Sequence, residues 1–316
     1  MPFWERLTER MRGAVNLGIL DRLTNGSESR ERFLRVARDF VPYVVAEHDG
    51  QLFVLATDDP THGKQFTRQK LKEQAVLQRA LTALERSGIE VRRRTFVDVG
   101  ANIGTTTLAA LEAGFVRVVA CEPLPRNVRI LRANLVLNGL EDLVTPLELA
   151  MSNRAGSGTI DTLGGSRKAR VLQPAELPRG QTEEIRLGRL DDLIDQGVVG
   201  PDEVGFLFVD AEGHERQVLE GASRLLRLDI PLVMEVNPKL LHLGGGTDGL
   251  SDVLALSYTH ILDLRSKGEP AFAPVESLET MIEEGKGTDI LACRLPRASH
   301  AAAGTRARAA PRAAAR

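Results

Sequence analysis

The nine residues from Phe96 to Gly104 limit the fold of this chain more than any other segment. They read Phe-Val-Asp-Val-Gly-Ala-Asn-Ile-Gly. The apolar first half is typical of a strand buried on both faces of a parallel sheet, and Thr105 is expected to start a helix. Glycine permits a sharp turn and the close approach of a ligand, and Asn102 tolerates a left-handed backbone. A strand, a glycine loop and a helix form the first crossover of a nucleotide-binding α/β sheet, whose ligands lie beyond the carboxyl ends of the strands.

Two acidic residues indicate which nucleoside would bind there. The loop lacks the pattern Gly-x-Gly-x-x-Gly, and Asp98 at the strand end would repel a pyrophosphate, which disfavours NAD and ATP. The same charge suits S-adenosylmethionine, a ligand with a cationic amine and a sulfonium. Glu122 follows a second apolar run, at the distance where an acid can hold two ribose hydroxyls. The alternative interpretation is a structural turn followed by a surface acid.

Composition limits the class of protein. The 316 residues are 42% hydrophobic and 27% charged, as in soluble globular proteins. Because residues 297–316 hold five Arg and no acid, the rest of the chain carries 36 basic and 43 acidic residues, which disfavours nucleic acid as a partner. Cys121 and Cys293 lie in apolar runs and are expected to be core residues rather than a disulfide. The chain has no membrane-length apolar run and no signal-peptide core, so we expect a cytoplasmic protein without a membrane partner.

The order of patterns predicts three parts. Residues 1–93 form an N-terminal extension, with a helix up to residue 41, a β-hairpin around Asp49-Gly50 and a helix from Phe66 to Arg86. Residues 94–296 alternate between strand and helix, as in a parallel sheet, and residues 297–316 form a disordered Ala/Arg-rich tail. A polar segment, 156–182, is expected to form a hairpin or loop over the sheet. The predicted sheet strands lie at 96–99, 116–121, 144–150, 204–209, 230–236, 258–264 and 289–295, with another short strand at 185–190. A small helix is expected to start at Asp191 and a longer one to span 214–227, and the segment between strands 258–264 and 289–295 is expected to be poor in helix.

A second group of polar residues follows the predicted strand 204–209. Its members share the carboxyl end of a central strand, where open α/β sheets place their chemistry; they are Asp210, Glu212, His214 and Glu215. Clustered carboxylates raise one another's pKa, which makes a general base usable at neutral pH. The alternative is that these acids cap the following helix, which would account for one of them.

Two further polar residues, Glu235 and Asn237, end the next predicted strand and would lie beside Asp210. They would extend the acceptor site or hold a divalent cation with Asp210 through oxygen ligands. The alternative for Glu235 is a buried acid paired with an Arg. We favour the interpretations without a metal and assign no metal ligands.

Taken together, these motifs resemble those of the FkbM family of S-adenosylmethionine-dependent methyltransferases, from about Phe96 to Asn237. One departure is Ala211, where the family more often has a β-branched residue. The resemblance rests on an ordered set of segments: residues 96–104, Cys121-Glu-Pro123, Ala150-Met-Ser-Asn153, Leu190-Asp-Asp-Leu193, Val209-Asp-Ala-Glu-Gly-His-Glu215 with Leu219 and Gly221-Ala222, and Met234-Glu235.

The resemblance implies a fold and a set of roles. The fold would be a Rossmann-like class I methyltransferase fold, a seven-stranded and mostly parallel α/β sheet with its last strand antiparallel, after an N-terminal helical and hairpin extension. Glu122 would hold the ribose, and Ser152 would lie near adenine. The methionine part of the cofactor would be surrounded by Asp98, Gly100, Asn102 and Gly104. The transfer site would contain Asp210, Glu212 and Glu215.

The expected activity is methyl transfer from S-adenosylmethionine to an oxygen, on a hydroxyl of a sugar or a secondary metabolite. Asp210 or Glu212 would take the hydroxyl proton, with His214 as a further candidate. An N-methyltransferase, which needs no strong base, remains an alternative. A non-catalytic binding module of the same fold is a further alternative. Such a chain would be expected to have lost the acids after strand 204–209, and this chain has kept them. The sequence does not name the acceptor, a small molecule or a glycan, or the oligomeric state.

Overall fold

The computed structural model describes residues 33–59, 71–163, 165, 168–173, 176–247, 249–268 and 271–295. Three predictions fall wholly or partly outside these ranges. They concern most of the helix before residue 41, the first part of the helix expected from Phe66, and the tail 297–316.

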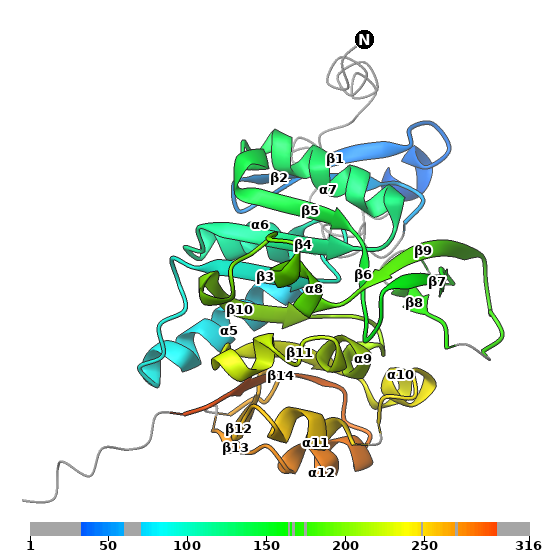
Figure 1. Ribbon diagram of the computed structural model, residues 1–316. Coiled ribbons are helices and arrows are strands. Elements are labelled where there is room, and N and C mark those ends of the chain that lie inside the picture. Colours follow the sequence, from blue (N-terminus) through cyan, green and yellow to red (C-terminus); the bar gives the residue numbers. More distant parts are fainter. Residues whose placement is uncertain are drawn as a thin grey trace, which may run out of the picture.

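Eight strands form the main sheet, in the order β13-β12-β14-β11-β10-β3-β4-β5 (Figure 1). Five neighbouring strands are parallel: β11 (Leu232–Val236), β10 (Val204–Val209), β3 (Thr95–Val99), β4 (Arg117–Glu122) and β5 (Val144–Glu148). The other three are β14 (Thr288–Cys293), which is antiparallel to both its neighbours, β12 (His260–Asp263) and the short edge strand β13 (Ala273–Pro274). The predicted Rossmann-like sheet with an antiparallel last strand is therefore confirmed, with β13 added.

Apolar side chains cover both faces of this sheet. Every residue of β3 and β10 is buried, and the rings of Phe96 and Phe206 stack with their centroids 5.4 Å apart. One core cluster packs this face against α5 (Lys72–Arg86), α6 (Thr105–Glu112) and α7 (Pro125–Leu137). The opposite face packs against α8 (Leu190–Asp195), α9 (Glu215–Glu220), α11 (Leu250–Ala255) and α12 (Ser277–Glu283). Helices on both faces explain the continuous apolar runs of the central strands.

The predicted N-terminal hairpin is present as β1 (Tyr43–His48) and β2 (Gln51–Ala56). Its turn residues Asp49 and Gly50 both have positive φ, as a two-residue hairpin turn requires. Asn134 of α7 and Asn138, the residue just after this helix, hold the hairpin, because their side-chain oxygens accept the N–H groups of Val54 and Leu52 in β2.

The polar segment after β5 forms a second sheet rather than a loop. Its four strands, in the order β6-β9-β7-β8, are β6 (Ala150–Met151), β9 (Thr182–Gly188), β7 (Gly156–Asp161) and β8 (Arg170–Val171). β7 and β9 are antiparallel, which agrees with the predicted hairpin. Figure 1 shows this small sheet beside the carboxyl ends of the parallel strands.

Helix predictions after β10 need correction. The helix expected over 214–227 divides into α9 and a short 3-10 helix at Leu225–Leu228. α9 ends at Gly221, where a Cβ would lie 2.0 Å from the backbone oxygen of Ser152. The segment after β12, expected to be poor in helix, contains α12, and α10 (Pro238–Leu243) and α11 were not predicted.

Two other expectations can be compared with the structure. Both cysteines are buried and unpaired, as predicted for core residues. Among the described residues, no helix combines the length and the apolar character needed to span a membrane.

Candidate active site

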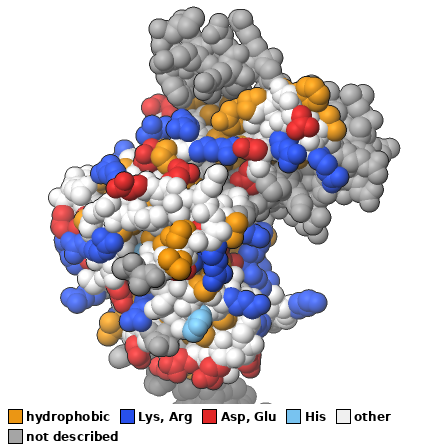
Figure 2. Space-filling model, turned by 90° about the vertical axis from the view of Figure 1, so that its right-hand side faces the viewer, with side chains coloured by type: hydrophobic (Ala, Val, Ile, Leu, Met, Phe, Trp, Pro, Cys, Tyr) orange, Lys and Arg blue, Asp and Glu red, His pale blue; other side chains and the backbone are white. Residues whose placement is uncertain are grey.

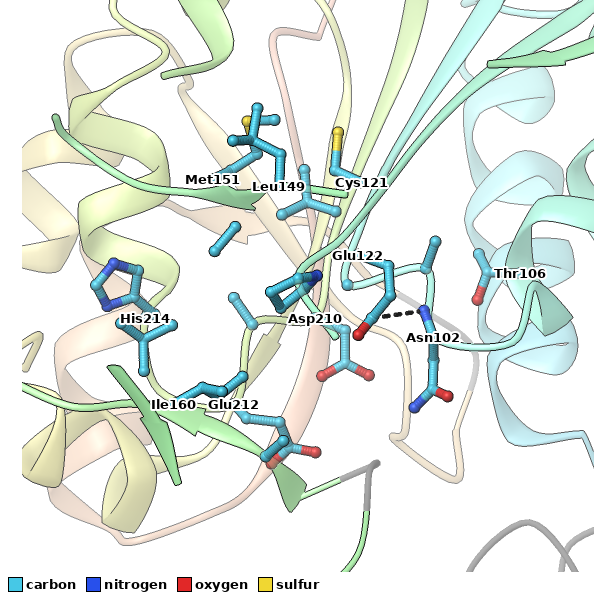
Figure 3. Close-up of a pocket in the computed structure, with 18 of the residues that line it drawn as sticks. Asn102, Thr106, Cys121, Glu122, Leu149, Met151, Ile160, Asp210, Glu212 and His214 are labelled. Carbon is cyan, nitrogen blue, oxygen red and sulfur yellow. Dashed lines mark hydrogen bonds between the residues drawn. The ribbon is translucent and has the colours of Figure 1, made fainter. Parts of the chain in front are cut away.

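A pocket lies where β3, β4 and β10 end, and the small sheet forms one of its walls (Figure 3). The space between its walls, open solvent at the mouth included, is about 830 Å³. Six predicted site residues line it: Gly100, Asn102, Glu122, Asp210, Glu212 and His214. Four others do not line it: Asp98, Gly104, Ser152 and Glu215.

The glycine loop is held between the ends of β4 and β10. The N–H groups of Gly100 and Ala101 donate to the backbone oxygen of Cys121, over 2.9 and 3.0 Å. A Cβ on Gly100, whose φ is +84°, would lie 1.9 Å from the backbone oxygen of Asp210. Asn102 has a φ of +52°, so the predicted left-handed turn is confirmed. The loop therefore brings bare backbone to the edge of the pocket, and only glycine fits at its tightest point.

Three hydrogen bonds position the carboxyl group of Glu122 at the pocket. Its Oε2 accepts the N–H of Asn102 at 2.9 Å, and its Oε1 accepts from Leu124 N and Asn127 Nδ2, both at 3.0 Å. Burial raises the pKa of its carboxyl to about 7. A carboxylate oxygen can accept more than one hydrogen bond, so Oε2 can take a ligand hydroxyl in addition to the loop N–H.

Asp98 lies beneath the loop rather than in the pocket. Its side chain is buried, and its Oδ2 accepts the hydroxyl hydrogen of Thr107 in α6, over 2.6 Å. Burial raises the pKa of Asp98 to about 7, and the nearby charge of Glu122 adds to the shift. Gly104 also lies away from the pocket, with a φ of +95° at the start of α6. Both residues shape the turn without facing the pocket.

Asp210 and Glu212 face the pocket from the end of β10. The N–H of Asp210 donates to Val99 O at 2.9 Å, which ties the two strand ends together. Glu212 has a φ of +49°, an uncommon backbone conformation for this residue type. Carboxylate oxygens of Asp210, Glu212 and Glu235 lie within 4.8 Å of one another, close enough to hold a cation.

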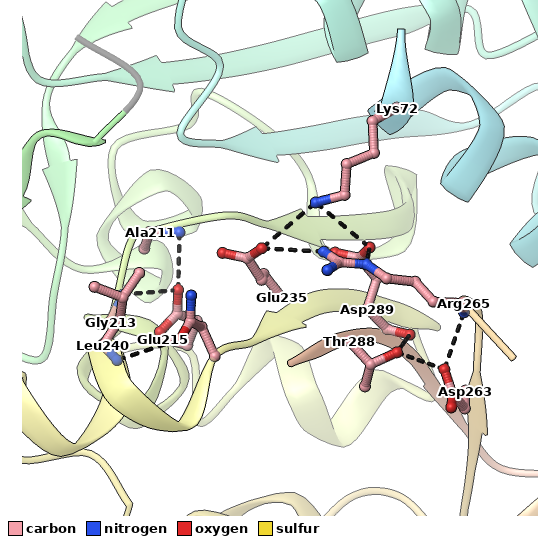
Figure 4. Close-up of polar contacts among 11 residues, drawn as sticks. Lys72, Ala211, Gly213, Glu215, Glu235, Leu240, Asp263, Arg265, Thr288 and Asp289 are labelled. Carbon is pink, nitrogen blue, oxygen red and sulfur yellow. Dashed lines mark hydrogen bonds and ion pairs between the residues drawn. The ribbon is translucent and has the colours of Figure 1, made fainter. Parts of the chain in front are cut away.

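Cationic side chains already neutralise Glu235 (Figure 4). Its Oε1 lies 3.0 Å from Arg265 Nη2 and 3.5 Å from Lys72 Nζ, and Arg265 also pairs with Asp289. This ion pair matches the second interpretation of Glu235 in the sequence analysis, a buried acid paired with an Arg. Asn237 caps α10, because its side chain accepts the N–H of Leu240. Both side chains therefore already have partners within the protein.

Glu215 stabilises the backbone of the acidic loop. Its Oε1 accepts the N–H groups of Ala211 and Gly213, each at 3.1 Å, and its side chain is buried. Burial raises the pKa of this carboxyl to about 7. These contacts fit the alternative given for the acids after strand 204–209, that they cap the following helix instead of acting in catalysis.

His214 lines the pocket from the start of α9. It is 5% exposed, and its Nε2 lies 2.9 Å from the hydroxyl of Ser152. Burial, together with the positive charge of Arg154, lowers its pKa to about 4. The imidazole is therefore neutral at pH 7.

Sequence reasoning missed part of the pocket wall. Glu73 of α5 lines it, although the N-terminal extension carried no recognisable site motif. The polar segment 156–182 contributes three apolar lining residues that were not predicted: Ile160, Ala169 and Val171. Single apolar residues in a polar segment carry no periodic signal, so nothing in the sequence pointed to them.

Comparison with known proteins gives one sequence match. The family model described as "Methyltransferase FkbM domain" matches residues 98–263, from within β3 to the end of β12. No match is found among curated proteins.

Solved structures give weaker likenesses. An O-methyltransferase from Bacillus cereus, in complex with SAH, is 15% identical with a TM-score of 0.39, covering 71% of this chain and 81% of that one. Precorrin-6y C5,15-methyltransferase from Geobacter metallireducens is 18% identical with a TM-score of 0.35, covering 68% and 86%. Both scores are low, so the family assignment rests on the sequence match.

Proposed function

Because the chain belongs to the FkbM methyltransferase family, we propose that it transfers the methyl group of S-adenosylmethionine to a hydroxyl oxygen of a sugar or secondary metabolite. The observation that carries the proposal is the arrangement of Glu122 and the glycine loop. Glu122 presents a fixed, buried carboxylate to the pocket, and the loop N–H of Asn102 holds it in place. A pair of adjacent ribose hydroxyls is the nucleoside group that suits such a carboxylate.

The pocket residues fit this cofactor. Gly100 lets the loop pack directly against the end of β10, because a Cβ there would lie 1.9 Å from the backbone oxygen of Asp210. Asn102 Oδ1 is buried without a hydrogen-bond partner among the described residues. That oxygen is an acceptor beside the loop, where the proposal places the cationic amine of the methionine part. When bound, the cofactor supplies an electrophilic methyl group on a sulfonium.

The acids at the end of β10 would serve the transfer step. The acceptor oxygen forms a bond to the methyl carbon, the carbon–sulfur electron pair stays on sulfur, and the hydroxyl proton moves to a carboxylate. Asp210 and Glu212 are the carboxylates that face the pocket beside the glycine loop. Holding the two reactants in line contributes roughly 7–11 kcal/mol when the geometry is ideal, and the base contributes about 10²–10⁴ in rate.

Two isosteric substitutions test the proposal. Asp210→Asn and Glu212→Gln keep the shape and remove the base, so affinity for S-adenosylhomocysteine should stay within about twofold while turnover falls by about 10²–10⁴. Turnover is measured as transfer of a labelled methyl group from S-adenosylmethionine into a small-molecule extract.

Glu141→Gln, on an exposed 3-10 helix, is the control and should behave as wild type. If both pocket variants turn over at the wild-type rate, the carboxylates are structural and the assignment of the base is wrong.

A further inference from the structure

Glu235 lies just beyond the pocket, beside the acids after β10. A carboxylate oxygen of Glu235 comes within 4.8 Å of carboxylate oxygens of Asp210 and Glu212, both of which line the pocket. Figure 4 shows Glu235 between the acidic loop on one side and the cationic side chains of Lys72 and Arg265 on the other. The part of the site that holds the proposed base therefore continues to Glu235.

The two carboxylate oxygens of Glu235 have different surroundings. Oε1 accepts from Arg265 Nη2 at 3.0 Å, and Arg265 is itself held because its Nε donates to Asp289. No described residue makes a hydrogen bond to Oε2, and the side chain of Glu235 keeps 14% of its surface exposed. The carboxylate is therefore held in place through one oxygen and can accept from a ligand through the other.

Lys72 brings hydrogen-bond donors to the same place. It is the first residue of α5, whose second residue, Glu73, lines the pocket. Its Nζ lies 3.5 Å from Glu235 Oε1 and 4.0 Å from Asp289 Oδ2, which is longer than an ordinary hydrogen bond. Both oxygens already accept from Arg265. Because the side chain of Lys72 is 49% exposed, its three N–H donors can turn to a ligand at Glu235.

The charges of this group favour a neutral ligand. Glu235 and Asp289 carry two negative charges, and Lys72 and Arg265 carry two positive ones, so an added ion would meet no unbalanced charge within the group. A hydroxyl matches the free atoms, because it can donate to a carboxylate oxygen and accept from an ammonium at the same time.

We propose that Glu235 and Lys72 bind a second hydroxyl of the methyl acceptor, on the carbon next to the one whose hydroxyl is methylated, so that the acceptor is a vicinal diol. The inference rests on the proposed function, because it places the reacting hydroxyl at Asp210 or Glu212. Hydroxyls on adjacent carbons can reach carboxylate oxygens that lie within 4.8 Å of each other. Glu235 and Lys72 are then acceptor-binding residues, and the N-terminal extension takes part in acceptor choice through α5.

Lys72→Met tests the role of the ammonium, because it keeps the aliphatic stem and removes the donors. In serial dilutions of the small-molecule extract, the variant should need about 10- to 100-fold more extract to reach half its maximal rate, the range for a lost hydrogen bond to a charged group. Its maximal rate and its affinity for S-adenosylhomocysteine should match those of wild type. Lys72→Arg keeps a cationic donor and should recover most of the apparent affinity.

Lys286→Met is the matched control. Lys286 is 50% exposed and pairs with Asp263 at 2.6 Å, further along the same edge of the sheet. Its substitution should leave the half-maximal dilution unchanged.

Periodate tests the acceptor class without a variant. It breaks the carbon–carbon bond of a vicinal diol, oxidises both carbons to carbonyls and is itself reduced to iodate. An extract treated with periodate, with the excess consumed by ethylene glycol before the enzyme is added, should no longer take up labelled methyl groups. An extract that receives periodate already consumed by ethylene glycol is the control and should keep its incorporation.

Undiminished incorporation after periodate treatment overturns the inference. So does an unchanged half-maximal dilution in Lys72→Met, because the second hydroxyl would then not be bound there. Both of these results leave the proposed function standing. If the wild-type protein transfers no methyl group into the untreated extract, the proposed function itself fails, and the inference fails with it.

Discussion

Asp98, Glu122 and Glu215 are buried carboxyls near the ends of the central strands, and each has a different structural role. Asp98 ties the loop to α6, Glu122 faces the pocket, and Glu215 holds the acidic loop. The sequence predicted that these acids would gather at one edge of the sheet, because parallel strands end there. It did not show which of them face the pocket, because that depends on the donors that the folded chain brings to each carboxylate.

Glu215→Gln should change how stability depends on pH. The folded pKa of Glu215, about 7, lies above its ordinary value of 4.5. Its contribution to the free energy of unfolding is therefore full below pH 4.5 and is lost as the pH rises through 7. The free energy of unfolding of the wild type minus that of the variant should fall as the pH rises across this range, by up to about 1.4 kcal/mol per pH unit.

Chemical denaturation at pH 5 and pH 8 measures this difference. The comparison with the variant is needed because His214 also makes the stability depend on pH. Its pKa is lowered to about 4, so its contribution to the free energy of unfolding is lost as the pH falls below 6.5. A difference between the two proteins that does not vary with pH would show that Glu215 is ionised in the folded state throughout.

Removing divalent cations should leave the protein unaffected. Glu235 is neutralised by Arg265 and Lys72, so the acidic group around Asp210 has less unbalanced charge to attract a cation. S-adenosylhomocysteine affinity and methyl transfer should be the same with EDTA and with added Mg²⁺. Loss of transfer in EDTA, restored by Mg²⁺, would make the three carboxylates a metal site.

At the scale of elements, the central strands of the main sheet were predictable, and the short helices α10, α11 and α12 were not. β10 has the predicted bounds, and β3 and β4 lie within a residue of theirs, because a buried parallel strand is a continuous apolar run bounded by turn residues. α10 and α11 have six residues each and α12 has seven. Helices of fewer than two turns show too little periodicity to be recognised, and these depend on packing against the sheet.

The contact between α7 and the N-terminal hairpin should contribute measurably to the free energy of unfolding. Asn134 is fully buried, accepts the N–H of Val54 at 2.6 Å and donates to Ile103 O at 2.8 Å. Asn134→Ala should leave both backbone groups buried and unsatisfied, at a cost of about 1–3 kcal/mol for each group. Thermal unfolding compares this variant with Gln196→Ala, an exposed substitution. Equal melting temperatures for the two variants would mean that the hairpin does not depend on this bridge.

At the scale of the whole molecule, two sheets create the site. The large sheet supplies the glycine loop, Glu122 and the acids after β10, and the small sheet supplies an apolar wall. On the side of these strand ends, basic and acidic side chains are interspersed, with a group of acidic ones at the lower edge (Figure 2). The small-molecule or glycan acceptor and the exclusion of nucleic acid both stay predictions.

The measurement that most directly tests the central claim is calorimetric titration of the wild-type protein with S-adenosylhomocysteine and, in parallel, with NAD. The account predicts one S-adenosylhomocysteine site per chain, weakened by about 1–3 kcal/mol in Glu122→Ala, the scale of a lost hydrogen bond to a charged group. It predicts no heat of binding with NAD. Binding of NAD without binding of S-adenosylhomocysteine would contradict the account.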